Sequence, residues 1–358
     1  METRRDFIKQ LTTAGLISSI PGQVWSNSLT GGLFNPSAPD KIWACLIHLS
    51  FNMWEDHDKY RVSNSKNQSV RYFDNNLRFS ENLWDSYLKK MVQNKMNMVV
   101  IDLGDGVKYD SHPEIAVNNA WTTSRVRAEV KRLKAMGLEP IPKLNFSAGH
   151  DQWLRQYSRM VSTETYYKVC AELIEEVCDL FDKPRFFHIG YDEETAMNQR
   201  FHSIVTVRQG DLWWHDFHFF VNEVEKQGSR TWIWSDLAWE HEEEFFSKMP
   251  KSVVQSNWYY LTDFSDPSHK AVRTYLRLAK EGYDQIPCGG YFVDERPDNR
   301  EGSMMATAKF AAQNFNNEHL LGFLHTSWRP TLDPYSDEIL DGVDFSGDAL
   351  KWYQSQKK

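Results

Sequence analysis

Eight short runs rich in β-branched, aromatic and other apolar residues alternate with longer segments of helical spacing along most of the chain. The runs that we expect to form strands are 42–50, 96–104, 139–146, 185–190, 230–236, 252–260, 284–290 and 320–328. The segments between them, such as TETYYKVCAELIEEVCDLF, repeat apolar residues every three or four positions. Strict alternation of this kind requires a parallel sheet with right-handed crossovers. A count of eight predicts a closed (β/α)8 barrel, the TIM barrel of the α/β class.

An open, doubly wound parallel sheet would show the same alternation, so it stays open as the second fold. Sheets of that kind bind nucleotide phosphates through a glycine-rich turn that follows a strand. None of the eight runs is followed by such a turn. The barrel is therefore the favoured architecture.

Charge and composition narrow the classes of partner. Charged residues make up 25% of the chain, the formal net charge is -8, and no block of basic residues occurs. Nucleic acids and anionic membrane surfaces are therefore poor candidate partners, and a neutral ligand fits better. No stretch is long and apolar enough to be an integral membrane segment. The four cysteines show neither metal spacing nor a dense disulfide pattern, so we expect reduced thiols in the core.

The amino terminus differs from the rest of the chain. TRRDFIKQLTTAGLISSIPG, residues 3–22, has two adjacent arginines followed by a short, mildly apolar stretch. This pattern resembles a twin-arginine export signal of bacteria, and a basic N-terminal helix is the alternative. We therefore assign residues 1–38 to an export signal and linker and residues 39–358 to the barrel. The expected location is periplasmic or extracellular.

The loops after the strands of such a barrel meet at one mouth, where the active site lies. Polar and aromatic side chains follow the predicted strands repeatedly, and the candidate site residues are His150, Tyr191, Asp192, Glu193, Trp234, Asp236, Trp258, Tyr259, Tyr291 and Trp328. The 14 tryptophans need an explanation, because cores are usually filled with other residues. Indole faces stack on the C–H faces of sugar rings, while carboxylates and imidazoles bind hydroxyl groups. The mouth is therefore predicted to bind a glycan.

The segment FFHIGYDEET, residues 186–195, places three consecutive carboxylates after the fourth predicted strand. Neighbouring side chains of a strand point to opposite faces, so Asp192 and Glu193 can share a ligand only beyond the strand's end. Glycosidases usually use two carboxylates about 5–9 Å apart on different strands, which adjacent residues fit badly. Adjacent residues fit substrate-assisted hydrolysis better, in which the 2-acetamido oxygen of the sugar attacks the anomeric carbon. One carboxylate then orients the amide, and its neighbour protonates the leaving group.

Several motifs resemble, in the same order, those of the family 20 glycoside hydrolases, whose best-known members are β-N-acetylhexosaminidases. HIGYDEE (188–194) resembles the His-x-Gly-Gly-Asp-Glu motif at the end of the family's fourth strand. NKMNMVVIDLGDG (94–106) and MGLEPIPKLNFSAGH (136–150) resemble its second and third strands, and RTWIWSD and HTSW its tryptophan-bearing fifth and eighth strands. The resemblance covers roughly residues 85–330.

The resemblance implies roles for the candidate residues. Glu193 would be the general acid, and Asp192 would polarise the acetamido nitrogen. Tyr291 or Tyr259 would bind the acetamido oxygen, and His150 would lie behind the acidic pair. The tryptophans that would surround the N-acetyl methyl group are Trp234, Trp258 and Trp328. The implied reaction is retaining hydrolysis of β-linked N-acetylhexosaminides, with no cofactor and no metal.

The sequence departs from the family pattern at the sugar-binding end of the pocket. The first strand and its loop, IHLSFNMWED, lack the family's arginine. Lys143 and Asn145 stand where the third strand of the family has Glu and Asp, and Tyr191 replaces a glycine. A catalytically silent glycan-binding relative is therefore the second candidate function.

The acidic run and a pair of histidines each permit a further reading. Asp192 and Glu193 could be solvated acids at a helix N-terminus, which is the role we expect for Glu194. His215 and His218, three residues apart in WWHDFHFF, could belong to a metal-dependent barrel hydrolase, although no third ligand is placed by the sequence. A serine hydrolase is not indicated, because no G-x-S-x-G motif occurs.

Overall fold

The structure is a computed structural model that describes residues 41–57, 70–291 and 302–356. The predicted export signal and linker, residues 1–38, lies outside the described residues. Lys41–Lys358 forms one compact unit.

The chain folds as a nearly closed barrel of eight parallel strands, which confirms the (β/α)8 prediction. The strands are β1 (Ile42–His48), β2 (Met98–Asp102), β5 (Glu139–Lys143), β6 (Phe186–His188), β7 (Arg230–Trp234), β8 (Val254–Ser256), β9 (Cys288–Gly290) and β10 (Gly322–Thr326). Their hydrogen-bonded order is β8-β7-β6-β5-β2-β1-β10-β9. Two isolated parallel bridges, Gln255 with Gln285 and Trp258 with Cys288, join the segments at the two open edges. Each strand falls within one of the eight predicted runs.

Alternation along the strands divides the apolar core into two layers. Along β1, Ile42, Ala44 and Leu46 belong to a cluster inside the barrel, and Trp43, Cys45 and Ile47 belong to the layer between strands and helices. Trp232 and Trp234 of β7 also lie in the inner cluster. The inner layer therefore ends at a tryptophan just below the mouth.

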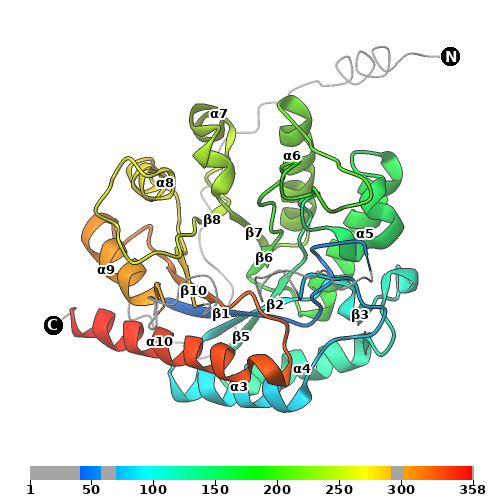
Figure 1. The fold of residues 1–358 in the computed structure, drawn as a ribbon, viewed down its shortest axis with the longest axis horizontal. Coiled ribbons are helices and arrows are strands. Elements are labelled where there is room, and N and C mark those ends of the chain that lie inside the picture. Colours follow the sequence, from blue (N-terminus) through cyan, green and yellow to red (C-terminus); the bar gives the residue numbers. More distant parts are fainter. Residues whose placement is uncertain (1–40, 58–69, 292–301, 357–358) are drawn as a thin grey trace. The chain divides into compact units, whose positions relative to one another are not determined.

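Eight helices of the described segments surround the strands, as Figure 1 shows, with α3, α4 and α10 along one side and α6 and α7 on the other. They are α3 (Glu81–Gln93), α4 (Thr123–Ala135), α5 (Glu164–Leu180), α6 (Asp211–Lys226), α7 (Glu242–Lys248), α8 (Lys270–Lys280), α9 (Met304–Asn314) and α10 (Ser336–Ser355). Hydroxyl side chains cap three of them: Ser80, Thr122 and Thr163 accept a hydrogen bond from a backbone N–H of the first turn. All four cysteines are buried and unpaired, as expected.

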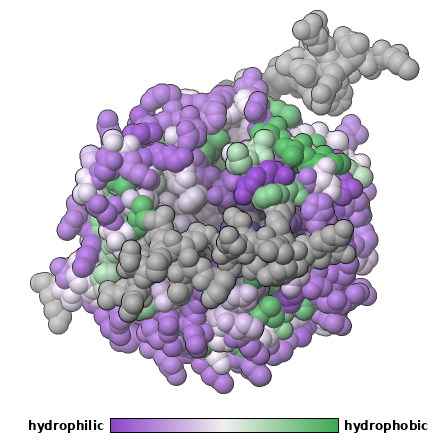
Figure 2. All heavy atoms as spheres, viewed as in Figure 1, coloured by the Kyte–Doolittle hydropathy of each residue, from purple (hydrophilic) through white to green (hydrophobic). Residues whose placement is uncertain are grey.

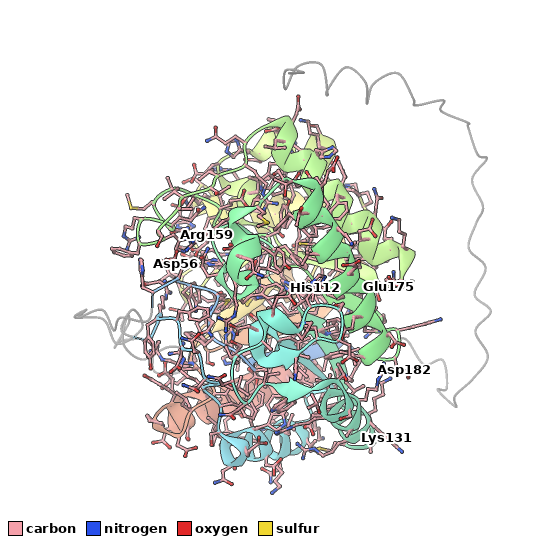
Figure 3. The ribbon with its side chains drawn as sticks, turned by 90° about the vertical axis from the view of Figure 1, so that its right-hand side faces the viewer. Asp56, His112, Lys131, Arg159, Glu175 and Asp182 are labelled. Atoms are coloured by element: carbon pink, nitrogen blue, oxygen red, sulfur yellow. The ribbon has the colours of Figure 1, made fainter. Side chains whose placement is uncertain are left out.

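The loops around the mouth are tied to one another. A short two-stranded sheet, β3 (Val107–Lys108) and β4 (Trp121–Thr122), lies in the β2–α4 connection. Asp56, in the loop after β1, accepts hydrogen bonds from the backbone N–H of Ser203 and lies 3.3 Å from Arg159. Figure 3 shows Asp56 and Arg159 next to each other on one flank. His202 forms a 2.8 Å hydrogen bond with the carbonyl of Trp54, so the β6–α6 loop is held against the β1 loop.

Within the described part of the chain, no helix is both long and apolar enough to cross a lipid bilayer. Most of the face in Figure 2 is hydrophilic, with apolar surface gathered over the loop that leads into α6. The exposed large apolar side chains of this region are Met197, Ile204, Val205 and Leu212.

Candidate active site

The chain turns sharply after β6, which explains how adjacent carboxylates can reach one ligand. Gly190, Tyr191 and Glu193 all have positive φ angles, of 69°, 71° and 52°. A Cβ atom on Gly190 would lie 2.1 Å from the Oδ1 atom of Asn145, so only glycine fits there. Asn145 Oδ1 accepts a hydrogen bond from the backbone N–H of Tyr191. Left-handed backbone at the two larger residues costs about 1–3 kcal/mol each, and such strain is often found at functional sites. The turn brings Asp192 and Glu193 to the mouth together.

Asp192 is a buried carboxylate held by two side chains of the loop that follows β5. Its Oδ1 accepts a 2.8 Å hydrogen bond from Asn145, and its Oδ2 lies 3.4 Å from His150 Nε2. Burial alone would raise the pKa of Asp192, but the charge and hydrogen bond of His150, with the charge of Lys143, lower it to about 2. Asp192 is therefore ionised at neutral pH.

Glu193 lies at the rim, where its side chain is 34% exposed. Its Oε2 atom is 3.3 Å from the same His150 Nε2. Burial opposes charge on His150, but the carboxylates of Asp192 and Glu193 raise the pKa of this histidine to about 10. The edge of the His150 ring packs on Trp54, with ring centroids 4.7 Å apart. A buried imidazolium thus bridges the two acids.

Asp236 is a third acid of the same cluster, in the turn after β7. Its Oδ2 accepts a 2.9 Å hydrogen bond from the backbone N–H of Glu193, which fixes the strained turn from the other side. Burial and the charge of Asp192 raise the pKa of Asp236 to about 7. The predicted residues Asp192, Glu193, His150 and Asp236 are thus brought together.

Aromatic rings stand next to this acidic cluster. We call Trp234, Trp258, Tyr260 and Trp328 the aromatic cup. The Trp234 and Trp328 centroids are 5.7 Å apart, and Trp258 stacks on Tyr260 at 5.2 Å. Trp328 Nε1 donates to the Tyr260 hydroxyl at 2.9 Å, and Trp258 Nε1 donates to Asp236 at 3.4 Å. Trp258 and Trp328 are half-buried, so their faces are partly accessible from the mouth.

Three predicted tyrosines lie away from the cup. Tyr191 is buried against α6, where its ring contacts Trp213 and Phe217. Tyr259 packs on Phe264 and donates to the carbonyl of Asp263, while Tyr291 packs on Phe345 of α10. Sequence reasoning missed Tyr260. Its signal was available, because residues two apart in an extended segment share a face, and Trp258 is itself a candidate.

Glu194 has a different environment from its two neighbours. Its carboxylate forms an ion pair with Arg208 of 2.5 Å and also accepts hydrogen bonds from two backbone N–H groups, those of Ala148 and Arg208. Helix α6 begins only at Asp211, so no helix starts at the acidic run. The interpretation as solvated acids at a helix N-terminus is therefore wrong, for Glu194 as for Asp192 and Glu193.

Lys143, one of the residues that depart from the family pattern, belongs to a buried charge pair below the mouth. Lys143 Nζ lies 2.5 Å from Asp102 Oδ2, and His48 lies 3.4 Å from the same oxygen. Burial would raise the pKa of Asp102, but the nearby Lys143 and His48 lower it. Asn145, the second departure, is the residue that orients Asp192. Both substitutions therefore have defined partners.

An arginine does reach the mouth, although not from the first strand. The guanidinium of Arg71 lies over the Trp54 ring, 4.0 Å from its centroid. Arg71, Trp54, His150 and Glu193 together line a small cavity of about 40 Å³. No motif places Arg71 there, because it precedes the second predicted strand by 25 residues.

The hypothesis of a metal site concerns His215 and His218 on α6. His215 is exposed and its ring contacts Tyr167, while His218 packs on Trp214. Among the described residues, the group with metal-ligand spacing is instead His150, Asp192 and Glu193, whose ligand atoms lie within 4.8 Å of one another. An ion there would have to displace the proton that the two carboxylates stabilise on His150.

Comparison with solved structures gives a consistent likeness. The chitobiase of Flavobacterium johnsoniae superposes with a TM-score of 0.53 and 17% identity, over 78% of this chain and 50% of that one. The family 20 β-N-acetylhexosaminidase of Streptomyces coelicolor A3(2) gives 0.59 and 15%, over 86% and 65%. The family 20 exo-β-N-acetylglucosaminidase of Vibrio harveyi, in complex with N-acetylglucosamine, gives 0.55 and 12%, over 87% and 56%.

The likeness is one of fold. The chain spans between half and two thirds of the length of these three solved chains. Its sequence matches no protein-family model and no curated protein.

Proposed function

We propose that the protein is a glycoside hydrolase that cleaves β-linked N-acetylhexosaminides through substrate assistance, with retention of configuration. The observation that carries this proposal is the pairing of an ionised Asp192 with a rim-exposed Glu193 around one buried imidazolium, His150, next to the aromatic cup. The fold shared with family 20 enzymes supports it.

The spacing of the two acids favours this mechanism over direct displacement by water. Inverting glycosidases separate their carboxyl groups by about 6.5–9.5 Å to admit a water molecule. Carboxylate oxygens of Asp192 and Glu193 lie within 4.8 Å of each other. This separation is too short for a water molecule and an anomeric carbon in line between them, which disfavours direct displacement by water. Two acids on one turn also fit badly the arrangement in which a second carboxylate attacks from the opposite face of the sugar, so a nucleophile from the substrate fits better.

Each residue then has one task in the proposed reaction. The acetamido oxygen attacks the anomeric carbon while the glycosidic C–O bond breaks. Glu193 must enter this step in its protonated form, and it transfers that proton to the departing oxygen. Asp192 accepts a hydrogen bond from the amide N–H and balances the positive charge of the cyclic oxazolinium intermediate. Glu193, now a carboxylate, takes a proton from the water that opens the ring, which restores the enzyme. His150 holds both acids in place, and Arg71 is positioned to bind sugar hydroxyls.

The test is turnover of aryl N-acetyl-β-glucosaminide and N-acetyl-β-galactosaminide by the full chain. We expect chromophore release with retained configuration, competitive inhibition by the thiazoline of N-acetylglucosamine, and a kcat lower by roughly 10²–10⁴-fold in Glu193→Gln. Circular dichroism and the Tm of the variant control for folding.

Three different outcomes would favour another function or mechanism. Glycan binding that Glu193→Gln leaves unchanged, without turnover of the aryl substrates or of a complex N-glycan, would identify a silent glycan-binding protein. Activity that a chelator abolishes would identify a metal-dependent hydrolase. An inverted product would exclude substrate assistance.

A further inference from the structure

A cleft of about 630 Å³ has the proposed acid, Glu193, among its lining residues, and none of the four residues of the aromatic cup lines it. Asp236 lines the cleft together with Glu193. Its walls are the β6–α6 loop, the start of α6, and the short helical turn Asp236–Trp239 that leads to α7. This volume is in the range of sites that bind small molecules, about 300–1,000 Å³. No step of the proposed reaction uses this cleft.

The walls combine indole rings, amide side chains and several acids, among them Glu240 and Glu244. Trp239 is half-buried and supplies an accessible ring, Trp213 and Trp214 line the cleft but are buried, and Asn198 and Gln209 supply amide side chains. Trp239 is held in place by a 2.9 Å hydrogen bond from its Nε1 to Asn257 and by the Trp258 ring, 4.3 Å away. Trp239 of the cleft thus packs directly on Trp258 of the aromatic cup.

The arginine and the lysine of the cleft are already paired with acids. Arg208 is bound to Glu194, and Lys270 lies 2.7 Å from Glu240. Arg208 and Lys270 are therefore both engaged by acids and are poorly placed to balance the charge of an anionic ligand, such as a phosphate or sulfate ester. Indole faces and amides without a net positive charge fit a neutral, hydroxyl-rich ligand.

We propose that this cleft binds the sugars on the leaving-group side of the scissile bond, so that the substrate is an oligosaccharide extending beyond the first leaving sugar. The inference rests on the proposed function, because Glu193 lines the cleft and is the group that would protonate the leaving oxygen. Binding energy from these remote sugars would be used in the transition state, so truncated substrates lose kcat/KM.

The first measurement compares a long and a short substrate of the wild-type chain. We expect kcat/KM for a β-1,4-linked N-acetylglucosamine tetrasaccharide to exceed that for the disaccharide at least roughly tenfold, which corresponds to about 1.4 kcal/mol. Equal values for the two would overturn the proposal and leave the hydrolase function standing.

A matched pair of variants locates the effect. Ala196 is exposed and lines the cleft, whereas its neighbour Met197 is 67% exposed and does not. Ala196→Trp places an indole in the cleft, so the ratio of long to short kcat/KM should fall to about one, while Met197→Trp should keep the wild-type ratio. The same fall in both variants would mean that the loop, rather than the cleft, is responsible.

A binding measurement separates this inference from the function on which it rests. Calorimetry with Glu193→Gln and the tetrasaccharide, with and without Ala196→Trp, reports on the cleft without turnover. If the wild type cleaves nothing but Ala196→Trp weakens binding about tenfold, the cleft is a glycan site and the hydrolase proposal fails. If there is neither cleavage nor binding, both proposals fail.

Discussion

Glu193 and Glu194 are the same residue type at adjacent positions, and the structure uses them in opposite ways. Glu194 has a side chain only 4% exposed, and both its oxygens are engaged by Arg208. Glu193 has a side chain 34% exposed, with His150 as its close charged neighbour. Glu193 has a left-handed backbone conformation, and the two neighbouring carboxylates have different partners.

With the role proposed for Glu193, one acidic run would serve the fold and the chemistry at once. A carboxylate whose lone pairs are filled by fixed donors is a structural anchor, because any change of charge leaves buried partners unsatisfied. A carboxylate at a rim, with few fixed partners, keeps hydrogen-bonding capacity for a ligand. Glu194 anchors the loop whose turn presents Glu193, so the two residues depend on each other.

The largest effect on stability should come from Arg208→Met, which removes the cation that Glu194 and Asp216 share. Arg208 Nη1 lies 3.2 Å from Asp216, whose side chain is fully buried. Removing one partner of a buried ion pair costs about 3–5 kcal/mol, because the remaining charge is left uncompensated. Urea unfolding measures the loss.

Arg200→Met is the matched control for this prediction, because Arg200 belongs to the same loop but is exposed. Its free energy of unfolding should stay within about 0.5 kcal/mol of the wild type. Equal losses in the two variants would show that the Glu194 anchor contributes no more than any surface contact.

A smaller, crossed effect should separate the two glutamates directly. Glu194→Gln replaces an acceptor of Arg208 by an amide, and we expect a loss of about 1–3 kcal/mol in the free energy of unfolding. Glu193→Gln should change stability by less than about 0.5 kcal/mol but remove the catalysis proposed above. Parallel unfolding and kcat measurements on the two variants test both expectations. A Glu194→Gln variant that is inactive but as stable as the wild type would contradict the assignment of Glu194 to stability and Glu193 to catalysis.

The fold was predictable because each signal is local. Alternation of apolar residues marks strands and helices wherever they lie, and eight repeats leave few architectures. The site was predictable as far as it follows strand ends, which covers Asp192, Glu193, His150 and Asp236.

What the sequence could not show depends on register and on loops. Lys143 pairs with Asp102 because the two are register partners in neighbouring strands, and a single sequence does not state which residues are opposite. Arg71 reaches Trp54 from a segment between two elements, with no periodic pattern to place it. Asn145 orients Asp192 across a gap of 47 residues. All three contacts are long-range, whereas sequence patterns report on neighbours.

The smallest expected effect concerns Asp236, whose carboxylate accepts a hydrogen bond from the backbone N–H of Glu193. Its pKa in the folded chain is raised to about 7, from an ordinary value of 3.8. A raised pKa means that the folded state binds this proton more tightly than the unfolded state. The resulting stabilisation is fully present below about pH 4 and is lost as the pH rises through about 7. Asp236→Asn removes this pH dependence of the free energy of unfolding. The stability of the variant relative to the wild type should therefore rise between about pH 5 and about pH 8.

The relative gain of Asp236→Asn should be about 1 kcal/mol, because the side chain is only half-buried and solvent screens part of the interaction. Thermal unfolding of both proteins at the two pH values measures it. Parallel pH dependence in the two proteins would mean that Asp236 titrates as an ordinary surface acid. The carboxylate that accepts the backbone N–H of Glu193 would then be permanently charged at neutral pH, and the turn that presents Glu193 would be held equally well from about pH 5 to about pH 8.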